Sequence, residues 1–440
     1  MKKVFVFLTL AALLASLTVV VSAATPAPGG PFSSSFRVQN LGSSAAGCTV
    51  TYYNSAGAVG ATSTLPSIAV GDSAYVYVPS VSGLADGMYS AVVACDQEVA
   101  AVVNYSDSDS GASFSGVGSD DAATTLYAPG VYNNYYNYYS NIVVQNTTSA
   151  PINMTVSIYA PGSSTPVATQ SATNVPAYAS ASFEQEGLAG LSSGIPYSAK
   201  VVGTGNIAAV VNIYGKGGVA AQLYSYNPFA SGSTTAYAPV IMNAYYGYNT
   251  SLTIQNLTST STSCTVTYGT GHTQSASVAG NSSVALYTPG SPVPAGTLTG
   301  AKVVCGQSVV VLVNESNRYN RAASYSGFAT GATTVRAPIV MRRYYQYNTS
   351  ITCQNIGSSA ATMTIQYGGI AGSNTSPSIS VNGTHLFYQP SDSLLSDNWI
   401  GSATITSAQD IVCIVNEDQN EGAKATTSMD QLYAYNGIGE

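Results

Sequence analysis

The side chains that could act as nucleophiles are mostly hydroxyls, and the groups that would activate them are rare. The sequence has only two histidines, His272 and His385, which lie in different parts of the chain. The run GLSSG at 190–194 fits the short pattern of a nucleophile elbow, which needs a strand before the serine, a helix after it and a histidine nearby. Ile195 and Pro196 follow it at once, so we interpret the match as chance.

Carboxylates are the next candidates for chemistry. Glu184 and Glu186 lack a partner that the sequence identifies as the second carboxylate of a glycosidase. Two loops that follow apolar runs hold clustered acidic oxygens of the kind that calcium prefers. These weak calcium candidates are Asp107, Asp109, Glu417 and Asp418. Neither loop has the full spacing of a calcium motif, so we favour solvated turns and expect no metal, no cofactor and no enzyme activity.

A pattern repeated four times sets where these residues lie. Each copy has a Gln-Asn pair near its start, at 39–40, 145–146, 255–256 and 354–355, and an asparagine that closes an apolar run. Such a period predicts an array of similar domains, here at 24–123, 124–233, 234–333 and 334–440. The closing asparagines are Asn104, Asn212, Asn314 and Asn416.

Within a repeat the pattern is that of β-strands. Short segments rich in valine, tyrosine and threonine alternate with a period of two and are bounded by turn residues. In repeat one we expect strands at 35–40, 47–53, 73–79, 88–95 and 98–105. This predicts an all-β chain of four tandem immunoglobulin-like antiparallel β-sandwich domains in a row. We interpret the Gln-Asn pairs as turns that end a strand, in preference to an exposed row of ligand-binding amides.

Residues 1–23 have two lysines, a long apolar run and small residues before Ala23, which predicts an export signal cleaved near that residue. Position 24 is alanine, so a lipoprotein anchor is not supported, and no basic flank indicates a transmembrane anchor. Only 7% of the residues are charged and the net charge is −7. Nucleic acid is therefore an unfavourable partner, because phosphate binding needs a basic surface. We expect a secreted or cell-surface protein.

The six cysteines follow the repeats. Cys48 and Cys264 match in position, as do Cys95 and Cys305, while in repeat four Cys353 and Cys413 are both shifted to the neighbouring strand. We therefore predict three disulfides in an oxidising compartment, and expect the bridged hairpins to face each other across the core. The predicted pairs are Cys48–Cys95, Cys264–Cys305 and Cys353–Cys413.

Repeats two, three and four begin with what we call a Tyr-rich segment, an Ala-Pro strand followed by a cluster of tyrosines. These tyrosines suit either packing against the preceding domain or contact with a partner protein or sugar ring. Repeat one has TPAPGGPFSSS instead, so it is either an atypical cap or an open edge that accepts a strand from another molecule. The tyrosines of the three segments are Tyr132, Tyr135, Tyr136, Tyr138, Tyr139, Tyr245, Tyr246, Tyr248, Tyr344, Tyr345 and Tyr347.

The Tyr-rich segments, the Gln-Asn turns and the closing runs AVVACDQEVAAVVNYS and AKVVCGQSVVVLVNES resemble tandem immunoglobulin-like β-sandwich repeats of bacterial secreted and cell-surface proteins. The resemblance implies an extracellular role and brings no catalytic residues. We expect a structural or adhesive protein that assembles with itself or other envelope proteins into a surface layer, sheath or filament. The alternative is an array that binds glycans through the tyrosine loops. Sequons such as those at Asn249 and Asn348 indicate surface character more than glycosylation.

Overall fold

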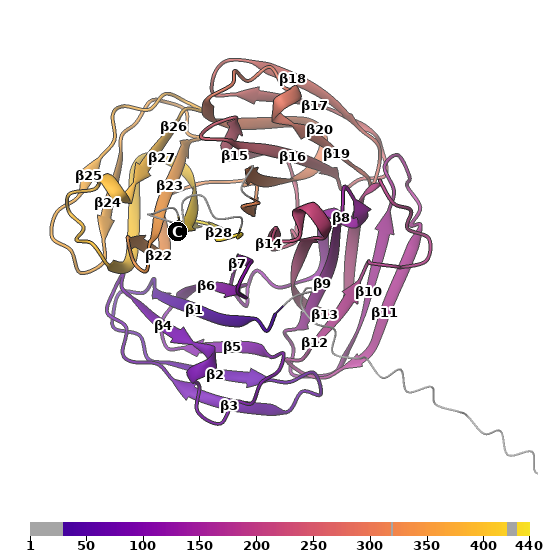
Figure 1. Cartoon of the computed structure of the whole chain (residues 1–440), viewed down its shortest axis with the longest axis horizontal. Helices are drawn as coiled ribbons and strands as arrows, with labels where there is room; N and C mark the ends of the chain where they lie inside the picture. Colours follow the sequence, from indigo (N-terminus) through magenta and orange to yellow (C-terminus); the bar gives the residue numbers. More distant parts are fainter. Residues whose placement is uncertain (1–29, 318–319, 420–428) are drawn as a thin grey trace, which may run out of the picture.

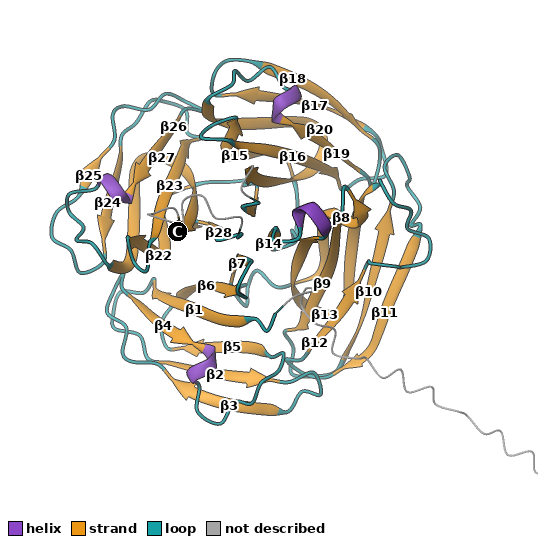
Figure 2. Cartoon of the chain, in the orientation of Figure 1, coloured by secondary structure: helices purple, strands orange, loops and turns teal. Residues whose placement is uncertain are grey.

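The computed structural model describes residues 30–317, 320–419 and 429–440. Over these residues the chain is almost entirely antiparallel β-structure, which confirms the all-β fold class (Figure 2). No helix of the described part is long and apolar enough to cross a membrane. The expected export signal lies outside the described residues. The 3-10 turns are η1 (Val78–Ser80), η2 (Gly217–Val219), η3 (Thr288–Gly290) and η4 (Gln389–Ser391).

The strands fall into four consecutive groups, which we call units one to four. Unit one has an outer sheet in the order β3-β2-β5 and an inner sheet in the order β4-β1-β6-β7 (Figure 1). All five strands expected from the sequence form, with small differences at their ends. The strands are β1 (Ser33–Asn40), β2 (Cys48–Tyr53), β3 (Val59–Thr64), β4 (Ser73–Tyr77), β5 (Ser90–Cys95), β6 (Val99–Ser106) and β7 (Gly111–Ser115).

The other units join their two layers through one long strand. In unit two the first half of β13 pairs with β10 and β8, and its second half pairs with β9 and β14. In unit one the matching strand is interrupted and forms β5 and β6. The strands of unit two are β8 (Ala123–Tyr135), β9 (Tyr138–Asn146), β10 (Ile152–Tyr159), β11 (Ala168–Val175), β12 (Ser180–Glu184), β13 (Pro196–Gly215) and β14 (Leu223–Tyr226).

Units three and four repeat this plan around β20 and β27. Unit three contains β15 (Ser233–Asn243), β16 (Tyr248–Asn256), β17 (Thr262–Tyr268), β18 (Thr273–Val278), β19 (Ser283–Tyr287), β20 (Thr297–Asn317) and β21 (Ala322–Ser326). Unit four contains β22 (Ala332–Arg342), β23 (Tyr347–Asn355), β24 (Met363–Tyr367), β25 (Asn374–Thr375), β26 (Thr384–Tyr388), β27 (Trp399–Gln419), β28 (Leu432–Asn436) and β29 (Ile438–Gly439).

The Tyr-rich segments begin with the strands β8, β15 and β22, which pair with the long strand of their own unit and which we call cover strands. The register shifts at the Ala-Pro step of each cover strand, because proline has no N–H to donate to the ladder. In unit one β5 pairs with β2, and its other edge has no partner strand within the described residues. The proline-rich segment of repeat one lies in part before residue 30, outside those residues.

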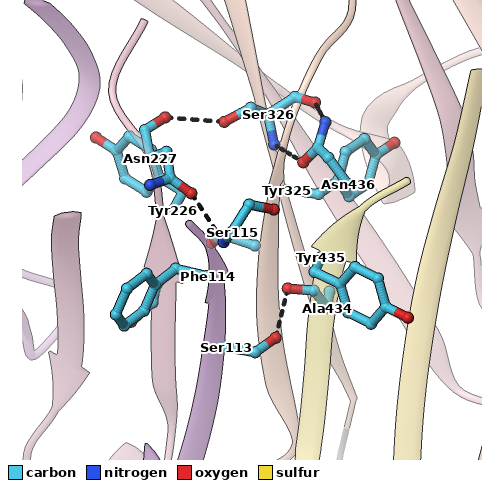
Figure 3. Close-up of a pocket in the computed structure, with 12 residues that line it drawn as sticks. Ser113, Phe114, Ser115, Tyr226, Asn227, Tyr325, Ser326, Ala434, Tyr435 and Asn436 are labelled. Carbon is cyan, nitrogen blue, oxygen red and sulfur yellow. Dashed lines mark hydrogen bonds between the residues drawn. The ribbon is translucent and has the colours of Figure 1, made fainter. Parts of the chain in front are cut away.

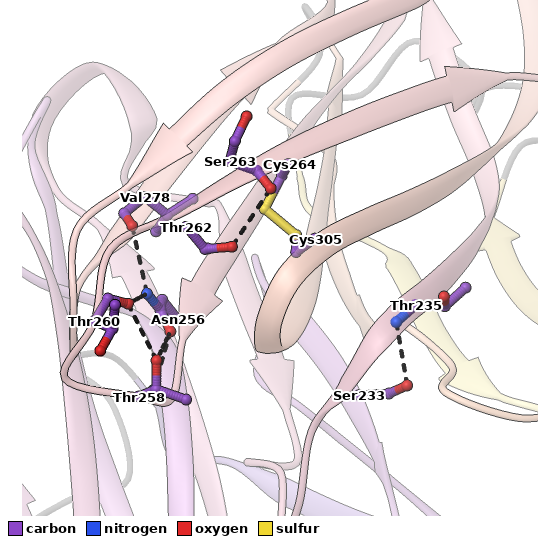
Figure 4. The surroundings of a disulfide bond; sticks show 10 residues. All are labelled: Ser233, Thr235, Asn256, Thr258, Thr260, Thr262, Ser263, Cys264, Val278 and Cys305. Carbon is purple, nitrogen blue, oxygen red and sulfur yellow. Dashed lines mark hydrogen bonds between the residues drawn. A yellow bond between two sulfur atoms is a disulfide. The ribbon is translucent and has the colours of Figure 1, made fainter.

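The three predicted disulfides are present. Each joins directly opposed residues of two adjacent antiparallel strands, with Cα atoms 4.0 to 4.2 Å apart (Figure 4 shows Cys264–Cys305). The expectation that the bridged hairpins face each other across the core is therefore wrong. The shift in unit four has another reason: the long strand passes through both layers, so a bridge can form with the opposed strand of either layer. In unit two the opposed pair is Met154 and Gly203.

The four units close into a ring, which corrects the expected row (Figure 1). The strands β7, β14, β21 and β28 lie at its centre, and each of them contacts the next, with β28 contacting β7. Unit four thus meets unit one although no chain segment joins them. A row would expose the residues that begin three of these strands, Leu223, Ala322 and Leu432, which are only 0 to 2% exposed in the ring. Their burial favours closure.

The cores of units two, three and four are each completed by a side chain from the following unit. Leu312 of unit three belongs to the core of unit two, Ile414 to that of unit three and Val102 of unit one to that of unit four. All three are 0% exposed. The matching Val210 of unit two, which lies at the joint with unit one, is partly exposed. The joint between units one and two therefore lacks part of the apolar cover that the other joints have.

The asparagines of the Gln-Asn pairs are buried and make turns. The Asn40 side chain donates to the carbonyl of Ser44 at 2.7 Å and accepts the N–H of Gly42 at 2.8 Å. The matching asparagines of the other units make the same kind of bonds. All four are 0% exposed, so the turn interpretation is confirmed and an exposed row of these amides is excluded.

Candidate functional site

Three hairpin tips display a tyrosine to solvent. Tyr136, Tyr246 and Tyr345 are 76, 85 and 74% exposed and occupy the turns between each cover strand and the next strand. Their φ angles of 51, 49 and 48° lie in the left-handed region that two-residue hairpin turns require and that a tyrosine seldom adopts. In each tip the preceding tyrosine packs edge-on against the exposed ring, with centroids 4.7 to 4.8 Å apart.

The remaining tyrosines of the Tyr-rich segments are turned toward the protein. Tyr132 packs in the core of unit two, where Leu312 of unit three also lies. The Tyr248 hydroxyl of unit three donates to Asp418 of unit four at 2.9 Å. Tyr248 thus contacts the following unit, whereas Tyr139 of unit two packs against a cluster that includes Tyr105 and Ala112 of the preceding unit. The cluster therefore divides into side chains that stiffen the ring of units and one side chain per tip that is free for contact. The residues turned toward the protein are Tyr132, Tyr135, Tyr138, Tyr139, Tyr245, Tyr248, Tyr344 and Tyr347.

The ends of the closing strands build the joints between units. In Asn416, Glu417 and Asp418 successive side chains alternate: Asn416 and Asp418 bond to unit three, and Glu417 bonds to unit one. This alternation is the normal geometry of a strand. It explains why the acidic residues of this segment do not converge on a common calcium site.

Asp430 links all four units near the centre of the ring. Its carboxylate accepts the N–H groups of Leu223 at 2.8 Å, Ala322 at 2.9 Å and Leu432 at 3.2 Å, which belong to units two, three and four. Its own N–H donates to the carbonyl of Asp109 in unit one at 2.7 Å. The residue is 0% exposed. Sequence reasoning missed it, because its partners are backbone groups that leave no side-chain signature.

A small pocket lies where the four central strands end (Figure 3). Ser115 and Ser326 alternate with Asn227 and Asn436 around it. The N–H of Ser115 donates to Asn227 Oδ1 at 3.0 Å, and that of Ser326 to Asn436 Oδ1 at 3.1 Å. The cavity volume is about 10 Å³, which suits one water molecule. The pocket is a polar closure of the ring and is too small for an organic substrate.

The residues considered for hydrolysis are not brought together. The Ser192 N–H bonds the Tyr197 hydroxyl, and no histidine belongs to unit two. His272 is exposed and contacts Thr270, whereas His385 lies edge-on to Phe387 with its pKa lowered by burial. In the same region Glu184 bonds Asn141 and burial raises its pKa, while Glu186 pairs with Lys216.

The calcium candidates have other partners. Asp107 accepts the N–H groups of Asp109 and Ser110 through one oxygen and that of Gly30 through the other. Burial raises the pKa of Asp107, but these backbone bonds outweigh it and the net shift is downward. Asp418 is paired with Arg321 across the joint between units three and four. In the part of the chain that the structure describes, no three metal-ligating side chains are grouped.

Comparison with known proteins adds little. No family model matches the sequence, and no curated protein matches it. Among solved structures, the crystal structure of Thermotoga maritima 1070 is similar over 22% of this chain and 94% of that chain, with 15% identity and a TM-score of 0.20. A match at this level says nothing about function.

Proposed function

We propose that this protein is an extracellular structural or adhesive protein that works through contacts between folded surfaces and takes a second copy of itself as partner. The observation that carries the proposal is the open edge of β5 in unit one. An exposed strand edge presents unpaired N–H and C=O groups to any chain that can add a strand. The three disulfides support a location outside the reducing cytoplasm.

The register identifies the groups on this edge. Cys48 and Cys95 are opposed with Cα atoms 4.2 Å apart, the short spacing of a pair that exchanges no backbone hydrogen bonds. Ala91 and Val93 belong to pairs of the same kind, since they alternate with it along β5. Their N–H and C=O groups therefore point away from β2, toward the open edge.

The apolar residues at this edge support an occupant. Val201, Val303 and Ile405 lie under cover strands and are 0% exposed. The matching Val93 is partly exposed, as is Val210 across the joint. Burying such residues together with the strand edge favours association. Every cover strand in the described residues is used within its own unit, and the same holds in a second copy. The open β5 edge of one copy is therefore expected to pair with the open β5 edge of the other.

Analytical ultracentrifugation and negative-stain microscopy of the purified mature chain test this proposal. We expect oligomers that are lost in Ala91→Lys, because a charge on the inner face of an edge strand opposes strand addition. Val59→Lys is the matched control: Val59 is 57% exposed on β3, the opposite edge of the same sheet, and should leave the oligomers intact. A monomer at all concentrations, or equal loss in both variants, would contradict the proposal.

A second candidate, glycan binding, is favoured by the three exposed tyrosines of the hairpin tips. An aromatic face with a free hydroxyl suits stacking on a sugar ring. Glycan arrays would show binding that falls in Tyr136→Ala, Tyr246→Ala and Tyr345→Ala and is kept in Tyr287→Ala, a variant of a tyrosine that is 54% exposed outside the tips. The absence of array binding, or an equal loss in Tyr287→Ala, would remove this candidate.

A further inference from the structure

In units one, three and four the residue directly after the closing asparagine bonds to the following unit, and its type differs between units. In unit one the Tyr105 hydroxyl donates to Oδ1 of Asn212, the closing asparagine of unit two, at 2.7 Å. Unit three has Glu315, whose Oε2 accepts Asn416 Nδ2 at 2.8 Å. At the matching place in unit four, Glu417 Oε2 accepts Nδ2 of Asn104, the closing asparagine of unit one, at 2.9 Å. The joint between units three and four and the joint between units four and one thus each have a glutamate carboxyl where the joint between units one and two has the Tyr105 hydroxyl.

Each of these carboxyl–amide pairs leaves two oxygens unsatisfied. Glu315 Oε1 with Asn416 Oδ1, and Glu417 Oε1 with Asn104 Oδ1, are buried and have no hydrogen-bond partner among the described residues. All four are acceptors when the carboxyls are ionised. Buried acceptors without a donor are costly, and the same cost arises in two independent joints.

One proton on each carboxyl resolves both deficits. A protonated carboxyl and a primary amide can form two bonds at once, from amide N–H to acid oxygen and from acid O–H to amide oxygen. The first bond is already present in both joints. The second would give the asparagine Oδ1 a hydroxyl donor, as Tyr105 already does for Asn212 in the joint between units one and two.

The surroundings favour the neutral acids. Glu315 and Glu417 are 0 and 1% exposed, and within the described ranges no cationic nitrogen lies within 4.0 Å of either carboxylate. Burial raises the pKa of each to about 8. The titratable group near Glu315 is Tyr325 on β21. The charged and titratable groups near Glu417 are Arg37 on β1, Tyr347 on β23, and Tyr433 and Tyr435 on β28.

We propose that unit four is held in the ring by two protonated carboxyl–amide pairs, Glu315–Asn416 and Glu417–Asn104, and that loss of these protons opens the ring at the joint between units four and one. That joint opens first because no chain segment spans it. The joint between units three and four has the continuous chain and the Arg321–Asp418 ion pair as well.

The direction of the pH dependence follows from the raised pKa values. Both values, about 8, exceed the ordinary 4.5, so the closed ring holds protons that the unfolded chain releases. The stability from these pairs is complete below about pH 4.5 and falls as the pH rises through about 8. Between about pH 4.5 and about pH 8 the opening equilibrium should increase up to about tenfold per pH unit for each proton released, and above about pH 8 it should level off.

The test uses the full mature chain and compares it with the double variant Glu315→Gln, Glu417→Gln. Glutamine offers the same two bonds without a titrating proton. We expect the radius of gyration from X-ray scattering to increase from about pH 6 to about pH 9 in the wild-type chain but not in the double variant. Infrared spectra of the wild type at about pH 6 should contain a protonated-carboxyl band that is weaker in the double variant, where the buried Asp430, whose pKa is also raised by burial, still contributes.

Controls separate this role from a general loss of stability. Tyr105→Phe weakens the joint between units one and two at every pH and should leave the pH profile of ring opening unchanged. If the double variant does not fold, each single Gln variant should remove about half of the pH dependence. Opening with the same pH profile in the Gln variants as in the wild type, or a protonated-carboxyl band that is no weaker in the double variant than in the wild type, would overturn the proposal.

Discussion

Unit one and unit two are built on the same strands, yet only unit two protects the edge of its outer layer with a cover strand. Because β8 lies against β13, Ala199 and Val201 are 0% exposed. The matching Ala91 is exposed and Val93 is partly exposed. The sheet of β3, β2 and β5 forms without a cover strand, so such a strand does not specify the fold. It determines whether a unit has a free strand edge.

The central strands of the units also differ in whether they bond to a cover strand. In unit two the Tyr226 hydroxyl donates to the carbonyl of Gly130 in the cover strand β8 at 3.1 Å and accepts its N–H at 3.2 Å. The equivalent tyrosines of units three and four bond their own cover strands alike. Unit one has Phe114 at this position. Because the described part of unit one has no cover strand, a hydroxyl there would have no such partner in it, and phenylalanine leaves no polar group unsatisfied.

The largest expected effect comes from a charge placed beneath a cover strand. Val201→Asp buries a carboxylate that has no partner and should cost more than about 4 kcal/mol, enough to unfold unit two. Val93→Asp makes the same change where water can reach, and should cost about 1 kcal/mol. Differential scanning calorimetry of the two variants measures the difference. Equal losses would mean that the edge of unit one is as well covered as that of unit two.

Disulfide removal separates an edge strand from an inner one. Two double variants remove one disulfide each: Cys48→Ala with Cys95→Ala, and Cys264→Ala with Cys305→Ala. Each should lower the free energy of unfolding by about 2 to 4 kcal/mol. The local result should differ, because β5 is then held by β2 alone, whereas β20 is still paired with β15. Hydrogen exchange should therefore show lost protection along β5 but not along β20. Equal protection of the two strands would contradict this difference.

The central tyrosine gives a smaller and reciprocal effect. Tyr226→Phe removes two hydrogen bonds to the cover strand and should cost about 1 to 2 kcal/mol in denaturant unfolding. Phe114→Tyr adds a hydroxyl where no cover strand lies and should change the stability by less than about 0.5 kcal/mol. A large gain in the second variant would mean that a backbone already lies beside Phe114.

Much of the fold could be predicted because the four copies check one another. The strands, the Tyr-rich segments and the disulfide pairs were identified from positions that recur, and the sheet register confirms their equivalence: Cys48 opposes Cys95 as Met154 opposes Gly203. A single copy would not have distinguished a structural cysteine from a free one.

The closure of the ring could not be predicted because its contacts do not recur. The joint position is Tyr105 in unit one, Ile213 in unit two, and Glu315 and Glu417 in units three and four, so no repeated signal marks it. Asp430 acts through backbone N–H groups of distant segments. The exposure of individual tyrosines was also hidden, since it depends on which residue occupies the hairpin turn.

The smallest effect concerns the hairpin tips, which the described part of unit one lacks. Tyr246 has a φ of 49° and is 85% exposed, so its ring contributes little packing while its backbone carries the cost of a left-handed conformation. Tyr246→Gly relieves that cost and should raise the free energy of unfolding by up to about 1 kcal/mol, whereas Tyr246→Ala keeps it and should change stability by less than about 0.5 kcal/mol. Urea titration compares the two. If Tyr246→Gly is more stable and both variants lose glycan or partner binding, the tyrosine is kept for contact at the expense of stability. If Tyr246→Ala instead loses much of the free energy of unfolding, the exposed ring has a structural role.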